Sequence, residues 1–421
     1  MVQPRITYKV VGSPEGGGGS ASTSQITLAF WREPMYFAGI DISKHHHEAL
    51  VLDGQGDPCK DSMSFSNTRT GIKSLIRKLE SFDEQVRVAL ESSGPYWLFL
   101  YDRLASRGYD VVVINPLQTN AYRKAGIHKA KTDPIDVFWI ADLLRINRAR
   151  PNPIPEAIRL QLRELGRFCF SLVDRIGDLK RKEISVLDRV FPGYKTLFSS
   201  VFLASSRRLL QKASSAQEFA RFDLSELTEL LRESSRCRFR ETKAREIIDQ
   251  AKSSIGISFL ANAAQLEILC LLEQIHFLEE QIQQIDDHLP LLLDKADQYL
   301  TTIPGIGVVL AATILGEIGD VNRFPELENL VAYAGIDPTV HRSGQFEAAV
   351  AHMSKRGSPY LRRALWLAAI VARQHDSDLK AYYQKKKQEE KHHNTVIGAL
   401  CRKLLARIYV ILEEEQPYVV R

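Results

Sequence analysis

The fold is decided by the stretch Met35-Tyr36-Phe37-Ala38-Gly39-Ile40-Asp41-Ile42-Ser43-Lys44. Its apolar run predicts a β-strand that carries one carboxylate, Asp41, between two isoleucines. A carboxylate in an apolar segment is costly unless it meets a cation. We therefore expect Asp41 to share a cation with other acids of the chain.

Three later acids stand at the ends of predicted elements. Glu91 follows a second strand-like run, 86–90. Asp133 before Pro134 reads as a helix N-cap followed by proline at the first helical position, and Asp136 lies three residues on, on the same helix face. The four carboxylates predict a cradle for two Mg²⁺ ions, which would clamp the attacking and leaving oxygens of a phosphodiester. Each acid alone is also explained as a cap or a solvated side chain, so the metal-site hypothesis depends on the group.

Charge is distributed unevenly along the 421 residues. The formal charge of the whole chain is only +5, whereas residues 355–407 hold 13 Lys and Arg against 4 Asp and Glu. The C-terminal part is therefore the candidate for contact with a polyanion. The length predicts two or three domains, and the hydrophobic fraction of 44% is ordinary for a globular protein.

The five cysteines are scattered, and no pair has the CxxC spacing of a zinc site or a redox motif. This pattern favours a reducing, cytoplasmic environment without disulfides. No apolar run is long enough to span a membrane, and the N-terminus lacks a signal-peptide pattern.

Four segments are expected. Residues 1–34, with a Gly-rich run at 16–19, form a flexible leader. Residues 35–150 predict three strands in a meander and then alternating helices and strands, an α/β domain in the order of a ribonuclease-H-like fold. Residues 151–298 predict a helical, coiled-coil domain, and residues 299–421 a third, mainly helical domain.

The middle segment contains two long apolar stripes with spacings of three and four residues. Such stripes are structural or oligomeric, and we assign them no chemistry. Their members are Leu160, Leu162, Leu165, Phe168 and Leu172, and then Leu266, Leu269, Leu272, Ile275, Leu278, Ile282, Ile285 and Leu289.

The third segment opens with Ile303-Pro304-Gly305-Ile306-Gly307 before an apolar helix. A Gly-rich turn of this kind presents backbone N–H groups to a phosphate, as in a helix-hairpin-helix element, although a plain tight turn is the competing interpretation. Farther on, Ser343 lies in the loop Arg342-Ser343-Gly344. It is either a nucleophile or an ordinary loop serine.

Basic residues accompany these motifs. Those around 123–131 predict a loop that holds a phosphate backbone, although a solvated loop is as consistent with the pattern. The candidate nucleic-acid-binding residues are Arg123, Lys124, Lys129, Lys131, Gly305, Gly307, Arg342, Lys355, Arg356, Arg362 and Arg363.

The order of these motifs resembles the DEDD transposases of insertion sequences of type 110, over roughly residues 35 to 410. The resemblance is carried by 39–44, Leu90-Glu91-Ser92-Ser93-Gly94, 131–136, the 303–307 turn, Ser343-Gly344 and 354–357. The chain departs from many relatives at Ala351 and Met353, and its leader has no matching counterpart.

The resemblance implies a RuvC-like domain that carries the acids Asp41, Glu91, Asp133 and Asp136 as Mg²⁺ ligands, a coiled-coil domain, and a transposase domain with Ser343 as nucleophile. It also implies a structured noncoding bridge RNA, donor and target DNA, a tetramer formed as a dimer of dimers, and a prokaryotic cytoplasm near the nucleoid. The resulting hypothesis is an RNA-guided DNA recombinase. Its rivals are a metal-dependent junction resolvase without a covalent intermediate and a non-catalytic nucleic-acid-binding scaffold.

Overall fold

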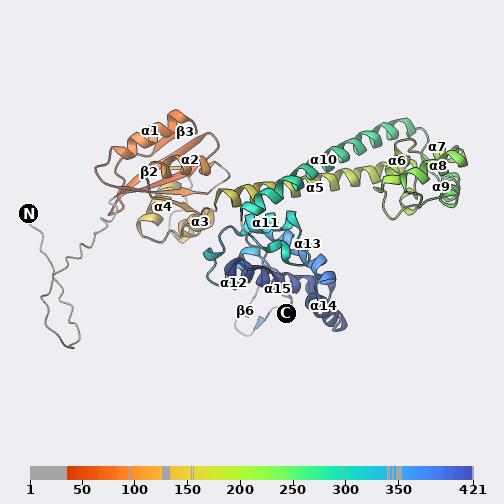
Figure 1. Ribbon diagram of the computed structural model, residues 1–421. Coiled ribbons are helices and arrows are strands. Elements are labelled where there is room, and N and C mark those ends of the chain that lie inside the picture. Colours follow the sequence, from red (N-terminus) through yellow and green to blue (C-terminus); the bar gives the residue numbers. More distant parts are fainter. Residues whose placement is uncertain are drawn as a thin grey trace, which may run out of the picture. The chain divides into compact units, whose positions relative to one another are not determined.

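The computed structural model describes residues 36–92, 94, 96–125, 133–152, 154, 156–296, 298–338, 342–343, 346–347 and 353–419. The chain divides after Asn152 into two compact units, each of which is described by itself (Figure 1). The segments expected as the middle and C-terminal domains both fall within the second unit. None of the described helices combines the length and apolar content needed to cross a lipid bilayer.

The N-terminal unit is a five-stranded mixed sheet with helices on both sides. The strand order is β3-β2-β1-β4-β5, with β1, β2 and β3 antiparallel and β1, β4 and β5 parallel. The elements are β1 (Tyr36–Ile42), β2 (His46–Asp53), β3 (Met63–Ser66), α1 (Arg69–Glu80), β4 (Val86–Glu91), α2 (Trp97–Ala105), β5 (Val111–Ile114), α3 (Pro116–Ala125) and α4 (Asp133–Arg145).

Strand β1 is buried on both faces over Ala38, Gly39 and Ile40, as expected for a strand between two layers of helices. Ala38, Ile40 and Ile42 are buried on one face, and Gly39 and Asp41 lie on the other, against α4. Helix α1 lies on the side of the sheet opposite α4 (Figure 1). The strand predicted within the stretch Met35–Lys44 and the meander of three strands that it begins are both confirmed.

The prediction of a basic loop at 123–131 is wrong for its first two residues, because Arg123 and Lys124 lie in the last turn of α3. The helix starts where Asn115 accepts a hydrogen bond from the backbone N–H of Leu117 (2.9 Å) and Pro116 occupies the first helical position. Residues 126–132 lie outside the described part of the chain.

The second unit is helical and is organised around two long helices, α5 (Ala157–Val190) and α10 (Ala261–Lys295), which pack on each other (Figure 1). Short helices pack at the distal end of the pair around a core that includes Tyr194 and Phe219. They are η1 (Tyr194–Thr196), α6 (Ala204–Leu210), α7 (Ala216–Ala220), α8 (Leu224–Ser234) and α9 (Glu241–Ser253).

The apolar stripes are therefore used largely within the chain. Leu162, Leu172 and Ile275 are buried, but Phe168 is 47% exposed and Leu266 is 65% exposed. The stripes thus leave part of their apolar surface on the outside of the helix pair.

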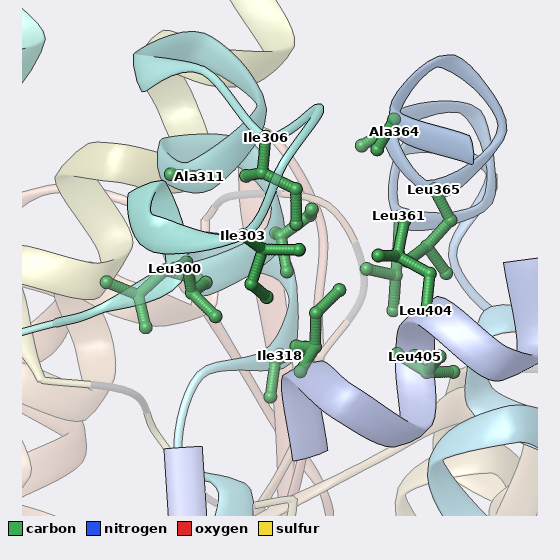
Figure 2. Packing of buried hydrophobic residues seen from close by; sticks show 14 of the residues in the cluster. Leu300, Ile303, Ile306, Ala311, Ile318, Leu361, Ala364, Leu365, Leu404 and Leu405 are labelled. Atoms are coloured by element: carbon green, nitrogen blue, oxygen red, sulfur yellow. The ribbon is translucent and has the colours of Figure 1, made fainter. Parts of the chain in front are cut away.

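The remaining helices form a second core against the other end of the α5–α10 pair (Figure 2). Gly166 of α5 and Gly316 of α11 allow a close crossing, since a Cβ at Gly316 would lie 2.4 Å from the backbone nitrogen of Arg163. The elements are η2 (Leu300–Thr302), α11 (Val308–Ile318), η3 (Val321–Arg323), α12 (Leu327–Ala334), β6 (Arg342–Ser343), β7 (Phe346–Glu347), α13 (Pro359–His375), α14 (Ser377–Gln388) and α15 (His393–Glu414).

Candidate active site

Two of the predicted acids meet at one edge of the mixed sheet. Strands β1 and β4 are parallel, with Gly39 opposite Ala89 and Ile40 opposite Leu90. Asp41 and Glu91 each follow one residue later, at the carboxyl ends of their strands, and both are half-buried. Because side chains alternate along a strand, Asp41 and Glu91 share the face of Gly39 and Ala89.

A third acid reaches this edge because α4 approaches β1 closely. A Cβ at Gly39 would lie 2.4 Å from the Val137 carbonyl oxygen and 2.5 Å from the Ala141 nitrogen, so only glycine permits this contact. Asp136 precedes Val137 in the first turns of the helix. The approach therefore places Asp136 on the same side of the sheet as Asp41 and Glu91.

The Glu91 carboxyl is within electrostatic reach of the other two acids. Burial raises the pKa of the Glu91 carboxyl, and the neighbouring Asp41 and Asp136 carboxylates raise it further. Two groups act in the opposite direction on this pKa: the Thr119 hydroxyl, which donates a hydrogen bond to Glu91 Oε1 (3.0 Å), and the Arg123 guanidinium. Mutual repulsion of this kind is typical of acids gathered for a functional purpose.

Arg123 is the cation of this cluster. Its Nη1 lies 2.9 Å from Asp136 Oδ1, and its Nη2 donates to Asn120 Oδ1 at 2.9 Å. Both members of the ion pair are mostly shielded from solvent, with exposed side-chain fractions of 23% and 19%. Arg123 thus has a role at the acids, whereas the sequence pattern suggested contact with a phosphate backbone.

The donor set fits a hard divalent cation, because carboxylate oxygens are the ligands that Mg²⁺ prefers. Within the described ranges, however, no three His, Cys, Asp or Glu side chains are grouped closely enough to hold a metal ion. Asp133 begins α4, but its side chain lies outside the described residues. The assignment of all four acids as ligands stays a prediction.

Comparison with known proteins identifies the family of this chain. Residues 38–192 match the family model of the IS110-type DEDD proteins, described as a transposase, and residues 297–384 match a model described as "Transposase IS116/IS110/IS902 family". The chain belongs to the IS110 family of transposases.

Relatives of this family match along almost the whole chain. A Streptomyces coelicolor protein named as a candidate mini-circle transposase for IS117 is 25% identical, covering 92% of this chain and 96% of its own length. A 44.8 kDa protein of the insertion element IS116 from Streptomyces clavuligerus is 24% identical, with 92% and 97% covered. The pilin gene-inverting protein of Moraxella bovis is also 24% identical, with 91% and 97% covered. As a member of this transposase family, the chain is an enzyme that cleaves and rejoins DNA strands.

The predicted nucleophile of the transposase lies on a short hairpin. Ser343 ends β6 and pairs with Phe346 of β7, and Arg342 pairs with Glu347. The side chains of these residues lie outside the described part, so the role of Ser343 stays a prediction.

Two nearby serines have partners that give them structural roles. Ser358 is buried, caps α13 through the Leu361 N–H, and donates to Glu317 Oε2 at 2.7 Å. The same Glu317 carboxylate accepts hydrogen bonds from Arg167 at 2.5 and 3.0 Å. Ser354 donates to the Asp337 carboxylate.

The predicted nucleic-acid contacts fall into distinct environments. Lys124, Lys355 and Arg356 are exposed, whereas Arg362 donates to the Ala334 carbonyl (3.2 Å) and Arg363 makes a bidentate pair with Asp174 at 2.7 and 2.8 Å. The last two are thus engaged within the protein, and Lys129 and Lys131 lie outside the described residues.

One side of the Gly-rich turn at 303–307 packs against helix α13. Gly305 has φ +95°, and a Cβ there would lie 2.6 Å from the Ala372 nitrogen of α13. Gly307 precedes α11, and a Cβ there would meet nothing within 4 Å. Of the two, Gly307 has the open surroundings that contact with a phosphate requires.

Three features of the acid cluster were not predicted from the sequence. Gly39 allows α4 to approach β1, the Thr119 hydroxyl donates to Glu91, and Arg123 pairs with Asp136. Gly39 was detectable in principle, because an isolated glycine inside a strand marks a close backbone approach. Thr119 and Arg123 carry no local signal, since their partners are 28 and 13 residues away in the chain.

Proposed function

We propose that this transposase is an RNA-guided, site-specific DNA recombinase whose acids act with Mg²⁺ and whose nucleophile is Ser343. The observation that carries the proposal is the convergence of Asp41, Glu91 and Asp136 at one sheet edge. The strand order, with an antiparallel meander followed by two parallel strands, supports a ribonuclease-H-like, RuvC-like domain.

The acids would hold the metal. Asp41, Glu91 and Asp136, together with Asp133, supply the oxygen ligands, and bound Mg²⁺ would neutralise charge that develops on a phosphodiester. For Asp136 to become a ligand, its bond with Arg123 must loosen. Arg123 would then be free to contact the phosphate, which reconciles its observed pairing with the predicted role.

Ser343 would perform the covalent step. Its Oγ attacks the phosphorus of one DNA phosphodiester and loses its proton to a base, while the bond from phosphorus to a deoxyribose oxygen breaks and that oxygen takes up a proton. The product is a phosphoserine link that conserves the bond for rejoining. In the reverse reaction, a hydroxyl of a second strand attacks the same phosphorus and releases the serine.

The names of the relatives favour recombination over hydrolysis. Transposition and the inversion ascribed to the Moraxella protein both require that cut strands be rejoined. A junction resolvase that only hydrolyses DNA would not need the Ser343 hydroxyl.

The guide RNA and the tetramer are proposed from family membership. The exposed cations Lys355 and Arg356, within the basic C-terminal stretch, supply charge for a nucleic-acid backbone. Part of the apolar stripes on α5 and α10 remains exposed and supports assembly through this helix pair.

The decisive experiment uses a nicked DNA substrate that traps covalent intermediates, followed by denaturing electrophoresis. Wild type should form a protein–DNA adduct, Ser343→Ala should form none, and Ser354→Ala should retain it. Ser358→Ala is a poorer control, because its hydroxyl caps a buried helix. An adduct that survives in Ser343→Ala, or the absence of any adduct in wild type, would refute the serine mechanism.

The role of the acids is tested separately. Asp41→Asn and Asp136→Asn should each abolish strand exchange in Mg²⁺ while far-UV circular dichroism stays unchanged. Near-normal exchange by either variant would contradict the metal-site proposal.

A further inference from the structure

Beside the acid cluster, the N-terminal unit contains a cavity to which the proposed function gives no role. Its volume is about 770 Å³. It lies between the first turns of α4 and the segment that connects β2 to β3. Its lining includes Leu50, Pro58, Lys60, Asp61, Phe138 and Trp139.

The walls of this cavity are held in place by the fold. The floor residue Leu50 is only 6% exposed and packs in a core with Val137 and Ala141, against which Phe138 also packs. The connecting segment is pinned by a β-bridge between Leu52 and Pro58 and by the hydrogen bond from the Cys59 nitrogen to the Val51 oxygen (3.0 Å). The cavity is therefore formed before any ligand arrives.

Two aromatic rings on α4 give the cavity its chemistry. The rings of Phe138 and Trp139 meet at 82° with centroids 5.4 Å apart, and the Trp139 ring is braced by Tyr122 at 87° and 5.4 Å. A flat ligand stacked on the Phe138 ring would thus lie roughly perpendicular to the Trp139 ring. This perpendicular arrangement suits a planar aromatic group, for which both stacked and edge-to-face contacts are favourable.

The rim adds positive charge. Lys60 lines the cavity and is exposed. Burial lowers the pKa of the Lys78 ammonium, and the neighbouring Lys60 ammonium lowers it further. The Lys78 Nζ also donates to the Asp61 backbone oxygen (3.0 Å). The Asp61 carboxylate opposes an anion at the same rim, so contact with a phosphate falls to the two lysines. Aromatic rings beside paired lysines are the combination found in proteins that bind single-stranded nucleic acids.

We propose that this cavity binds an unpaired base of the DNA strand held at the acids, with the base stacked on Phe138 and the adjoining phosphate at Lys60. Ile135, Asp136 and Phe138 all belong to the first turns of α4, so the cavity and Asp136 lie within roughly 5.4 Å of each other along the helix axis. Side chains two residues apart point roughly 200° apart around that axis, so the strand would cross α4 between the acids and the cavity. The inference rests on the proposed function, which brings a DNA strand to Asp136. Its test measures binding alone and does not require cleavage.

The test compares two probes with the full-length protein in the absence of divalent metal. One is a single-stranded oligodeoxythymidylate of roughly 20 nucleotides, and the other has the same length and backbone but no bases. Wild type should prefer the probe with bases by about 5-fold to 150-fold, the range expected for one stacked base. Phe138→Ala should reduce this preference to less than about twofold.

Matched variants separate the site from general effects. Phe99→Ala removes another aromatic ring of the same unit, 45% exposed on α2, and should keep the full preference. Lys60→Ala should weaken both probes equally, because it removes a phosphate contact and no base contact. Phe138→Leu keeps apolar volume without the aromatic face, and should lose the preference while retaining the wild-type melting temperature.

Several outcomes would overturn the inference. The inference fails if wild type binds the two probes equally, or if Phe138→Ala keeps the full preference for the probe with bases. It also fails if Phe99→Ala loses this preference to the same extent, or if a base preference is found only when an oligouridylate, an RNA probe, replaces the DNA probe. If Asp41→Asn and Asp136→Asn retain strand exchange while Phe138→Ala loses base preference, the metal-site proposal fails and the base pocket stands. If the acid variants lose strand exchange while Phe138→Ala keeps its base preference, only the base pocket is overturned.

Discussion

Gly39 offers the sharpest test of how the acid cluster is built. In Gly39→Ala the new methyl group would lie 2.4 Å from the Val137 oxygen and 2.5 Å from the Ala141 nitrogen. Both are backbone atoms in the middle of α4, so no rotamer change can relieve the contact. The helix must retreat from β1 by about 1 Å before the distances become those of ordinary van der Waals contact.

The retreat should affect both stability and activity. Overpacking of this kind typically costs about 1–3 kcal/mol, which corresponds to roughly 4 °C in melting temperature per kcal/mol for a unit of this size. Asp136 moves with α4, and a displacement of about 1 Å at a reacting centre can lower a rate by about 100-fold. We therefore expect a modest loss of thermal stability and a much larger loss of strand exchange.

Gly54→Ala is the matched control, because a Cβ at Gly54 meets nothing within 4 Å. Melting of the N-terminal unit is followed by tryptophan fluorescence, to which Trp97 and Trp139 of this unit contribute, and exchange is measured at equal protein concentration. The reasoning is refuted if Gly39→Ala melts and reacts like wild type, or if Gly54→Ala loses as much as Gly39→Ala.

Three further predictions concern the helical unit. Glu183 is fully buried, neither of its carboxylate oxygens has a hydrogen-bond partner among the described residues, and burial raises its pKa to about 7. The contribution of Glu183 to stability should therefore be fully present below pH 4.5 and fall by up to about 3 kcal/mol as pH rises through 7. Glu183→Gln should remove that fall, and denaturant midpoints that still decline between pH 5 and pH 8 would contradict it. Glu317→Ala should cost about 1–3 kcal/mol, since it leaves the buried Ser358 hydroxyl without its acceptor and removes the partner of Arg167. Exposed Glu280→Ala should cost less than about 0.5 kcal/mol in the same denaturant titration. Phe277→Glu, at a ring 58% exposed on α10, should lower the oligomer mass in light scattering without altering the melting temperature, and an unchanged mass would count against assembly through this face.

Phe277 is chosen in place of the positions that the sequence pattern alone suggests for breaking an oligomer. The periodicity of the stripe gives Leu272 and Leu278 as positions for breaking an oligomer. In the structure Leu272 is buried in the chain's own distal core, so a glutamate there would unfold the protomer and leave assembly untested. A heptad-like pattern identifies an apolar seam but does not say whether the partner helix belongs to the same chain.

Local patterns predicted the elements that carry the acids, because strand ends and helix starts have short-range signals. Asp41 and Glu91 were placed correctly at the ends of β1 and β4, and Asp136 in the first turns of α4. The helix over Arg123 was missed, although Asn115-Pro116 is a usable start signal. The pairing of Arg123 with Asp136 and the donation from Thr119 to Glu91 depend on how α3 packs, which no local pattern reports.

These two contacts bear on how acid-to-amide variants should be interpreted. Clustered carboxylates repel one another, and the raised pKa of Glu91 records that repulsion, with burial as the larger cause. Arg123 and Thr119 offset part of it with groups of the protein itself. Replacing Asp41 with asparagine removes one of the repelling charges and leaves both of these contacts in place, and equal melting temperatures of the variant and the wild type would show that the fold is kept. A loss of strand exchange in Asp41→Asn would then report on chemistry at the acids. Asp136→Asn also breaks the Arg123 ion pair, so its melting temperature must be measured before its activity is interpreted.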